Sequence, residues 1–190
     1  MGNVIEFRNI TKYFPGVKAL DDISFTANGG EVLALMGENG AGKSTLLKVL
    51  NGDYQQTSGE YLVNGEPCHF NSPREAVAAG IGVIYQERQI MLELTVGENI
   101  FLGRLPTGFM GRIKMREVHS RAQAIIDEFG LDMKSTDKVK DLSVAYQQMV
   151  EIMKAYSREN LKMIAFDEPT ASLSDSEIDS LFRLSLIHIS

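Results

Sequence analysis

Apolar and polar positions follow a strand-like order along much of this 190-residue chain. Val4 to Ile10 and Ile23 to Ala27 alternate with a period of two, which is typical of half-buried strands. Short, mostly apolar runs at 32–36, 81–85 and 162–166 predict further strands, the first two of them buried. Because helical segments separate several of these strands, the pattern predicts an α/β fold.

The middle of the chain has a helical spacing from about residue 95 to 157. The residues that recur at this spacing include Met115, Val118, Ala122, Ile125, Ile126 and Phe129, and Gly130 is expected to end that helix. This part is therefore predicted to be a helical insertion in an otherwise α/β chain.

Turn and cap residues mark where several elements begin or end. Asn64-Gly65 predicts a hairpin between short strands near 61–63 and 68–70. Ser72 to Glu75 and Ser174 to Glu177 each fit the capping-box pattern, and in the first of them a proline occupies the first helical position.

Composition and charge restrict the class of protein. The formal net charge of −6 disfavours a nucleic-acid partner, since phosphate backbones recruit basic surfaces. The single cysteine, Cys68, excludes a disulfide within the chain and suits a reducing compartment. No apolar run approaches the ~20 residues that a membrane-spanning helix needs, so we expect any membrane association to be peripheral.

The stretch GENGAGKST contains the most specific chemical signal in the chain. It follows the apolar run 32–36 and precedes a predicted helix at 44–50, so that Gly37, Gly42, Lys43 and Ser44 form G-x-x-x-x-G-K-S in the context of a P-loop. Glycines let backbone N–H groups wrap a phosphate chain, the lysine supplies a point charge, and the serine hydroxyl can ligate Mg²⁺. The alternative, an ordinary glycine-rich turn, does not explain all of these features together.

An acidic pair follows the predicted strand 162–166. Asp167 would stand at its carboxyl end, where ligands collect in open α/β sheets, and would hold the metal. Glu168 is one residue further and would act on the attacking water as general base. The alternative is a solvated acidic pair that begins a turn.

A third element is Ser143, at the start of an amphipathic helix, which taken alone fits a simple N-cap better than an anion contact.

With these elements in place, the chain resembles the nucleotide-binding domain of ABC transporters over about residues 3 to 183. GENGAGKST, Gln86 in VIYQE, the signature at Leu142 to Tyr146, FDEP and ASLSD occur in the order typical of that family. The resemblance implies a P-loop NTPase (RecA-like) core, a small antiparallel β annex and an inserted α-helical subdomain. It also implies ATP and Mg²⁺ as cofactors.

Longer stretches are similar to one branch of the family. TKYFPGVKALDDISF, IYQE, ELTVGENIFLGR and LSVAYQQMVEI resemble the first ATPase domain of bacterial monosaccharide importers of the ribose, galactose, xylose and arabinose type. These carry two such domains on one chain. The resemblance implies an ATPase that powers sugar import from the cytoplasmic face of the inner membrane. Its partners would be the second ATPase domain, permease subunits and, indirectly, a periplasmic sugar-binding protein.

The resemblance also implies roles for single residues. Phe14 would stack on adenine, with Tyr13 as the alternative and with core packing as the competing explanation. Gln86 would contact Mg²⁺ and the attacking water, and Asp175 would belong to a loop that links paired sites. The remaining nucleotide contacts would be Gly37, Asn39, Gly40, Gly42, Lys43, Ser44 and Thr45. The catalytic residues would be Lys43, Gln86 and Glu168. The metal ligands would be Ser44, Gln86 and Asp167. Ser143 would act in trans on the paired domain.

Two features depart from the family pattern. The signature reads LSVAY where LSGGQ is usual, with Ala145 and Tyr146 as the changed positions of interest. The last residues, LSLIHIS (184–190), read like a translated sequencing adapter, so native sequence is expected to end near Arg183; the alternative is a genuine helix end. Two rival functions remain at this point: an ABC ATPase outside transport, and a piece that binds ATP without hydrolysing it.

Overall fold

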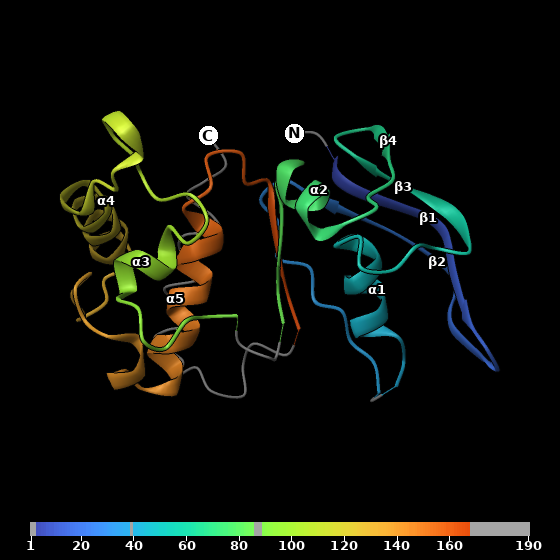
Figure 1. Ribbon diagram of the computed structural model, residues 1–190. Coiled ribbons are helices and arrows are strands. Elements are labelled where there is room, and N and C mark those ends of the chain that lie inside the picture. The colour runs from blue at the N-terminus through green and yellow to red at the C-terminus, as the bar shows by residue number, and fades with distance from the viewer. Residues whose placement is uncertain (1–2, 39, 86–88, 168–190) are drawn as a thin grey trace. The chain divides into compact units, whose positions relative to one another are not determined.

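The computed structural model describes residues 3–38, 40–85 and 89–167, with backbone only for residues 3 and 4. The described residues form two compact units. The sheet unit contains residues 3–83 and 160–167, and the helical unit contains residues 84–159, each without the gaps just given. Figure 1 shows the strands β1–β4 with α1 and α2 in the first unit, and the helices α3–α5 in the second.

The sheet unit is built on a four-stranded antiparallel sheet in the order β2-β1-β3-β4. Its strands are β1 (Asn3–Phe14), β2 (Val17–Asn28), β3 (Ser58–Val63) and β4 (Glu66–Cys68). The first two strands extend beyond their alternating segments, because pairing continues to the turn at Gly16. The hairpin predicted at Asn64-Gly65 is confirmed, with φ of 52° and 79° at its two residues.

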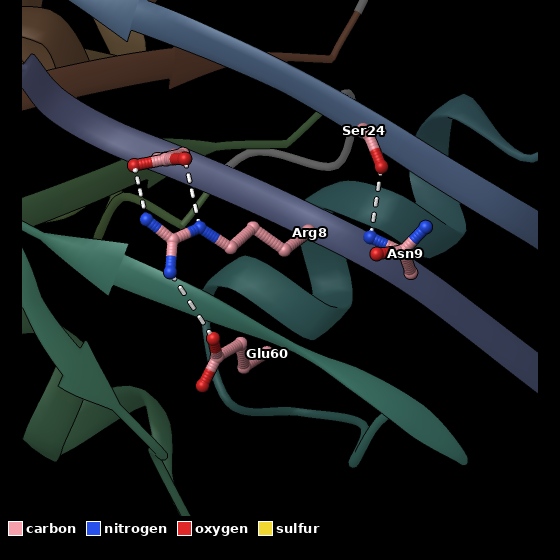
Figure 2. Close-up of polar contacts among 5 residues, drawn as sticks. Arg8, Asn9, Ser24 and Glu60 are labelled. Atoms are coloured by element: carbon pink, nitrogen blue, oxygen red, sulfur yellow. Dashed lines mark hydrogen bonds and ion pairs between the residues drawn. The ribbon is translucent and has the colours of Figure 1, made fainter.

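Polar contacts on one face of the sheet connect β1 with both of its neighbours. The Arg8 guanidinium donates to the Glu6 carboxylate on its own strand and, over 3.3 Å, to Glu60 on β3 (Figure 2). The Asn9 N–H donates to Ser24 Oγ on β2 at 2.8 Å, where the register shifts between Phe7 and Ile10 (Figure 2). The ion pairs of Arg8 with Glu6 and Glu60 lie at the surface and therefore add little stability.

The core of the sheet unit lies on the apolar side of β1 and β3. Phe7 is stacked between Phe25 and Tyr61, with ring centroids 4.6 and 5.7 Å away. The elements that join this core are α1 (Lys43–Leu50), α2 (Pro73–Ala78) and the paired strands β5 (Ile81–Ile84) and β6 (Met163–Phe166). Their buried side chains are Leu46, Leu47, Val49, Leu50, Ala76, Ile81 and Ala165.

Two local predictions are wrong. Residues 32–36 are not a buried strand: their backbone joins no described strand, and Val32 and Met36 are 58% and 92% exposed. An apolar run is a buried strand only where neighbours supply hydrogen bonds and cover both faces, and no described residue does so here. Ser72 does not complete a capping box, because the Glu75 carboxylate accepts from the Asn71 N–H and the Ser72 hydroxyl makes no cap bond.

The helical unit contains α3 (Val96–Ile100), α4 (Met115–Glu128) and α5 (Val144–Tyr156), with 3-10 turns η1 (Phe109–Gly111) and η2 (Val139–Asp141). Gly130 lies just beyond α4 with φ 65°, as expected for a helix terminator. Arg104 donates to the carbonyl oxygens of Ile100, Lys154 and Ser157, and so caps the ends of both α3 and α5. Burial lowers the pKa of this guanidinium.

A complete capping box, which sequence analysis did not single out, begins α3. The Glu98 N–H donates to Thr95 Oγ1 at 3.2 Å, and the Thr95 N–H donates to the Glu98 carboxylate at 2.8 Å. The second of these bonds lowers the pKa of Glu98 below its ordinary value. Because this helix has only five residues, its start depends strongly on the cap.

We predict that Thr95→Ala lowers the free energy of unfolding of the helical unit by about 1 kcal/mol, the usual contribution of a threonine N-cap. Ser120→Ala, at an exposed position within α4, is the matched control. Urea unfolding followed by circular dichroism measures both. Since the pKa of Glu98 is lowered in the folded state, its contribution is complete above the unfolded-state pKa and disappears as pH falls through the folded one. Equal midpoints for the two variants at neutral pH would contradict the prediction.

Candidate functional site

The glycine loop before α1 has a backbone that only glycine adopts easily. Gly40 and Gly42 have φ of 86° and 93°, in the left-handed region. A Cβ on Gly42 would overlap the Ala19 carbonyl oxygen and the Leu20 side chain of β2. Gly42 is also the N-cap of α1, with no side-chain cap bond, so the first-turn N–H groups remain available to an anion.

Lys43, the first residue of α1, directs its charge back over the loop. Its ammonium donates to the carbonyl oxygens of Gly37 at 2.6 Å and Glu38 at 3.0 Å. The loop itself is closed by a bond from the Ala41 N–H to the Glu38 carbonyl oxygen. A cation is thus held over a ring of backbone groups at a helix N-terminus, an arrangement suited to a polyphosphate.

Ser44 and Asp167 meet although they are 123 residues apart in sequence. The Ser44 hydroxyl donates to Asp167 Oδ1 at 3.1 Å, and Asp167 directly follows β6. A hydroxyl and a carboxylate are hard oxygen ligands, so this pair fits Mg²⁺. In the described part of the chain, no group of three or more His, Cys, Asp or Glu side chains could hold a metal. This does not conflict with Mg²⁺, which commonly takes one or two protein ligands together with water and phosphate oxygens.

Phe14 lies at the end of β1 in an aromatic and basic cluster. Its ring meets Tyr54 edge-on with centroids 5.2 Å apart, and Lys12 Nζ lies 5.0 Å from the Phe14 centroid. The Tyr54 N–H donates to the Lys48 carbonyl oxygen, which ties the cluster to α1. Sequence analysis missed Lys12 and Tyr54. Lys12 could have been found, since residues two apart on a strand share a face, but the position of Tyr54 depends on tertiary structure.

Tyr13, the alternative aromatic, is exposed on the opposite side of the strand from Phe14. It is 49% exposed, and Lys18 Nζ lies 5.4 Å from its ring centroid.

Of the remaining predicted site residues, two lie in the described part of the chain and four lie outside it. Thr45 follows Ser44 in the first turn of α1. Ser143 is the exposed N-cap of α5, and its Oγ accepts from the Tyr146 N–H at 3.3 Å, which confirms the capping role. Asn39, Gln86, Glu168 and Asp175 lie outside the described residues.

Comparisons with known proteins agree on one family. The family model described as "ABC transporter" matches residues 20–171. The chain is 51% identical over 184 residues to the arabinose import ATP-binding protein AraG 1 of Burkholderia ambifaria, which covers 97% of this chain and 36% of the relative. It is 52% identical over 180 residues to AraG of Vibrio parahaemolyticus, with 95% and 35% covered. The chain therefore spans about a third of the length of these curated relatives.

Solved structures of ATP-binding cassettes have the same fold. MJ1267, an ATP-binding cassette of an ABC transporter in its ADP conformation, superimposes with a TM-score of 0.80 at 28% identity, covering 98% of this chain and 77% of its own. The dimeric cassette MJ0796, bound to ADP and Pi, superimposes with a TM-score of 0.75 at 26% identity, covering 95% and 80%. The predicted fold class, a P-loop NTPase core with a β annex and inserted helices, is thereby confirmed.

We predict that Gly42→Ala destabilises the sheet unit more than Gly40→Ala. Both substitutions put a side chain at positive φ, which costs roughly 1–2 kcal/mol. Only the Cβ at Gly42 meets described backbone, so that variant must also displace β2. Urea unfolding measures the two differences in free energy. Equal losses would show that the contact with Ala19 does not constrain the loop.

Proposed function

The chain belongs to the ABC transporter family, and from that premise we propose that it binds ATP together with Mg²⁺ and serves as the first ATPase domain of a longer monosaccharide importer. The observation that carries the proposal is the meeting of Ser44 with Asp167 beside a lysine held over the glycine loop. Two segments far apart in the sequence, the glycine loop with the start of α1 and the residue after β6, thus contribute to one site.

Each described residue has a distinct task in this proposal. Lys43 exchanges its bonds to the Gly37 and Glu38 carbonyl oxygens for bonds to phosphate oxygens, which keeps the ammonium satisfied before and after binding. The first-turn N–H groups of α1 orient the phosphate chain. Ser44 and Asp167 hold the metal, and Mg²⁺ when bound neutralises charge on the phosphates. Glu168, as general base, and Gln86, beside the metal and the attacking water, complete the proposed catalytic set.

Transport of a sugar is supported by the relatives. Proteins 51% and 52% identical to this chain are named for arabinose import. Their greater length leaves room for a second ATPase domain, the partner on which exposed Ser143 would act. Among the described residues, no helix is long and apolar enough to cross a membrane. From the likeness to import ATP-binding proteins we propose that the domain acts peripherally, at the cytoplasmic face of the inner membrane, on permease subunits served by a periplasmic sugar-binding protein.

The first test combines nucleotide binding with phosphate release. We expect the purified chain to bind ATP with Mg²⁺, and Lys43→Ala to weaken binding by at least ~tenfold because a charge-assisted phosphate contact is lost. Lys134→Ala, which removes an exposed lysine of the helical unit, is the control and should bind normally. Absence of ATP binding in the unmodified chain would refute the proposal.

Turnover distinguishes the roles of binding and catalysis. The chain alone should release phosphate slowly, since its site lacks the signature of the second domain. In the full-length parent, Glu168→Gln should keep ATP binding and lose turnover. Steady hydrolysis by the purified chain that Glu168→Gln abolishes would instead mean that a second domain is unnecessary.

Phe14 and Tyr13 can be separated by the same binding assay. Phe14→Ala should weaken ATP binding by about tenfold, since stacking on an aromatic side chain contributes ~1–3 kcal/mol per base. Tyr13→Ala should have little effect. Because stacking tolerates every base, GTP should bind nearly as well as ATP. The reverse order of the two variants would assign the base contact to Tyr13.

A further inference from the structure

The segment between α3 and α4 forms a small ordered hairpin, here called the basic hairpin (residues 106–116). The Gly108 N–H donates to the Arg112 carbonyl oxygen at 2.8 Å, and the Lys114 N–H donates to the Pro106 carbonyl oxygen at 2.9 Å. Thr107 and Ile113 form an antiparallel bridge between these bonds. The hairpin therefore has a defined tip, the 3-10 turn η1 (Phe109–Gly111).

Two large apolar side chains stand at that tip. Phe109 is 91% exposed and Met110 is 85% exposed, so almost none of their apolar surface is covered. Met110 has φ 61°, which is an unfavourable backbone for an unbranched apolar side chain, and Ile113 is also exposed. A strained residue whose apolar side chain is exposed to solvent does not stabilise the folded state, and such residues are typical of functional sites.

The charge around the tip is opposite to that of the chain. The basic hairpin (106–116) contains three basic and no acidic side chains, in a chain of net charge −6. Lys114 pairs with Glu117 at 3.4 Å. Arg112 and Arg116 are exposed, and neither guanidinium forms an ion pair with a carboxylate of the described residues, so both charges are available. The apolar tip is thus flanked by free cations.

We propose that the basic hairpin docks on an anionic lipid surface. Phe109 and Met110 enter the headgroup layer, while Arg112 and Arg116 lie at the level of the lipid phosphates. Exposed apolar side chains next to lysine and arginine are the combination that binds peripheral segments to anionic bilayers. A projecting tip with about nine-tenths of each side chain exposed suits insertion into a soft layer.

The other exposed apolar run of the chain lacks this combination. Val32, Leu33, Leu35 and Met36 lie between Glu31 and Glu38, and the first basic residue after them is Lys43. An anionic surface would repel these flanking carboxylates. The contrast provides an internal control, since both regions expose apolar side chains and only one carries positive charge.

The test is co-sedimentation of the purified chain with vesicles of phosphatidylcholine alone or mixed with phosphatidylglycerol. We expect binding to the mixed vesicles only. Arg112→Gln with Arg116→Gln should weaken it about thirtyfold, since each cation near an anionic surface contributes ~1 kcal/mol. Phe109→Ser with Met110→Ser should weaken it at least ~tenfold. Circular dichroism of each variant verifies folding.

Two control variants decide what a loss of binding means. Val32→Ser with Met36→Ser removes two apolar side chains that are 58% and 92% exposed, and Arg74→Gln with Lys162→Gln removes two exposed cations of the sheet unit. Both should bind the mixed vesicles normally. Equal losses in the controls, or equal binding to neutral vesicles, would overturn the proposal in favour of unspecific adhesion.

The proposal would also be overturned if the unmodified chain did not bind vesicles. In that case, reduced sugar uptake by parent proteins that carry the hairpin substitutions would indicate that the hairpin contacts a protein partner. ATP binding by the same hairpin variants should be unchanged. The outcome for the hairpin is therefore independent of the outcome for the nucleotide site.

Discussion

Burial of α1 in the core of the sheet unit is the constraint on which the candidate site depends. Leu46, Leu47, Val49 and Leu50 are enclosed by side chains from the antiparallel sheet, α2, β5 and β6. Complete burial of each such side chain contributes ~1.5–3 kcal/mol, so the helix cannot shift without a large loss of stability. The start of α1 is therefore held at one place, and the glycine loop, Lys43 and Ser44 are held with it.

Close approach to β2 adds precision at the helix start. Gly42 lies so near the Ala19 carbonyl oxygen that no side chain fits between them. On the same helix, Ser44 reaches the end of β6 through Asp167. The polar groups that would hold a phosphate and a metal are thus positioned by contacts with two strands, β2 and β6, which leaves little freedom in their spacing.

Side-chain caps close both ends of two helices in the helical unit. Thr95 and Ser143 cap the starts of α3 and α5, and Arg104 caps the ends of both helices. Such caps satisfy backbone groups that short helices cannot satisfy themselves. They fix the unit internally while the basic hairpin keeps its tip in solvent.

The sequence alone determined the local elements and the chemical types at the site. Periodicity located β1, β2, α4 and α5, and the order of glycine, lysine and serine predicted a phosphate loop before a helix, because these signals depend on neighbouring residues only. Tertiary structure decided what depends on distant partners. It joined Ser44 to Asp167, put Tyr54 against Phe14, and left 32–36 exposed, since hydrogen bonds and burial require a second segment that local sequence does not specify.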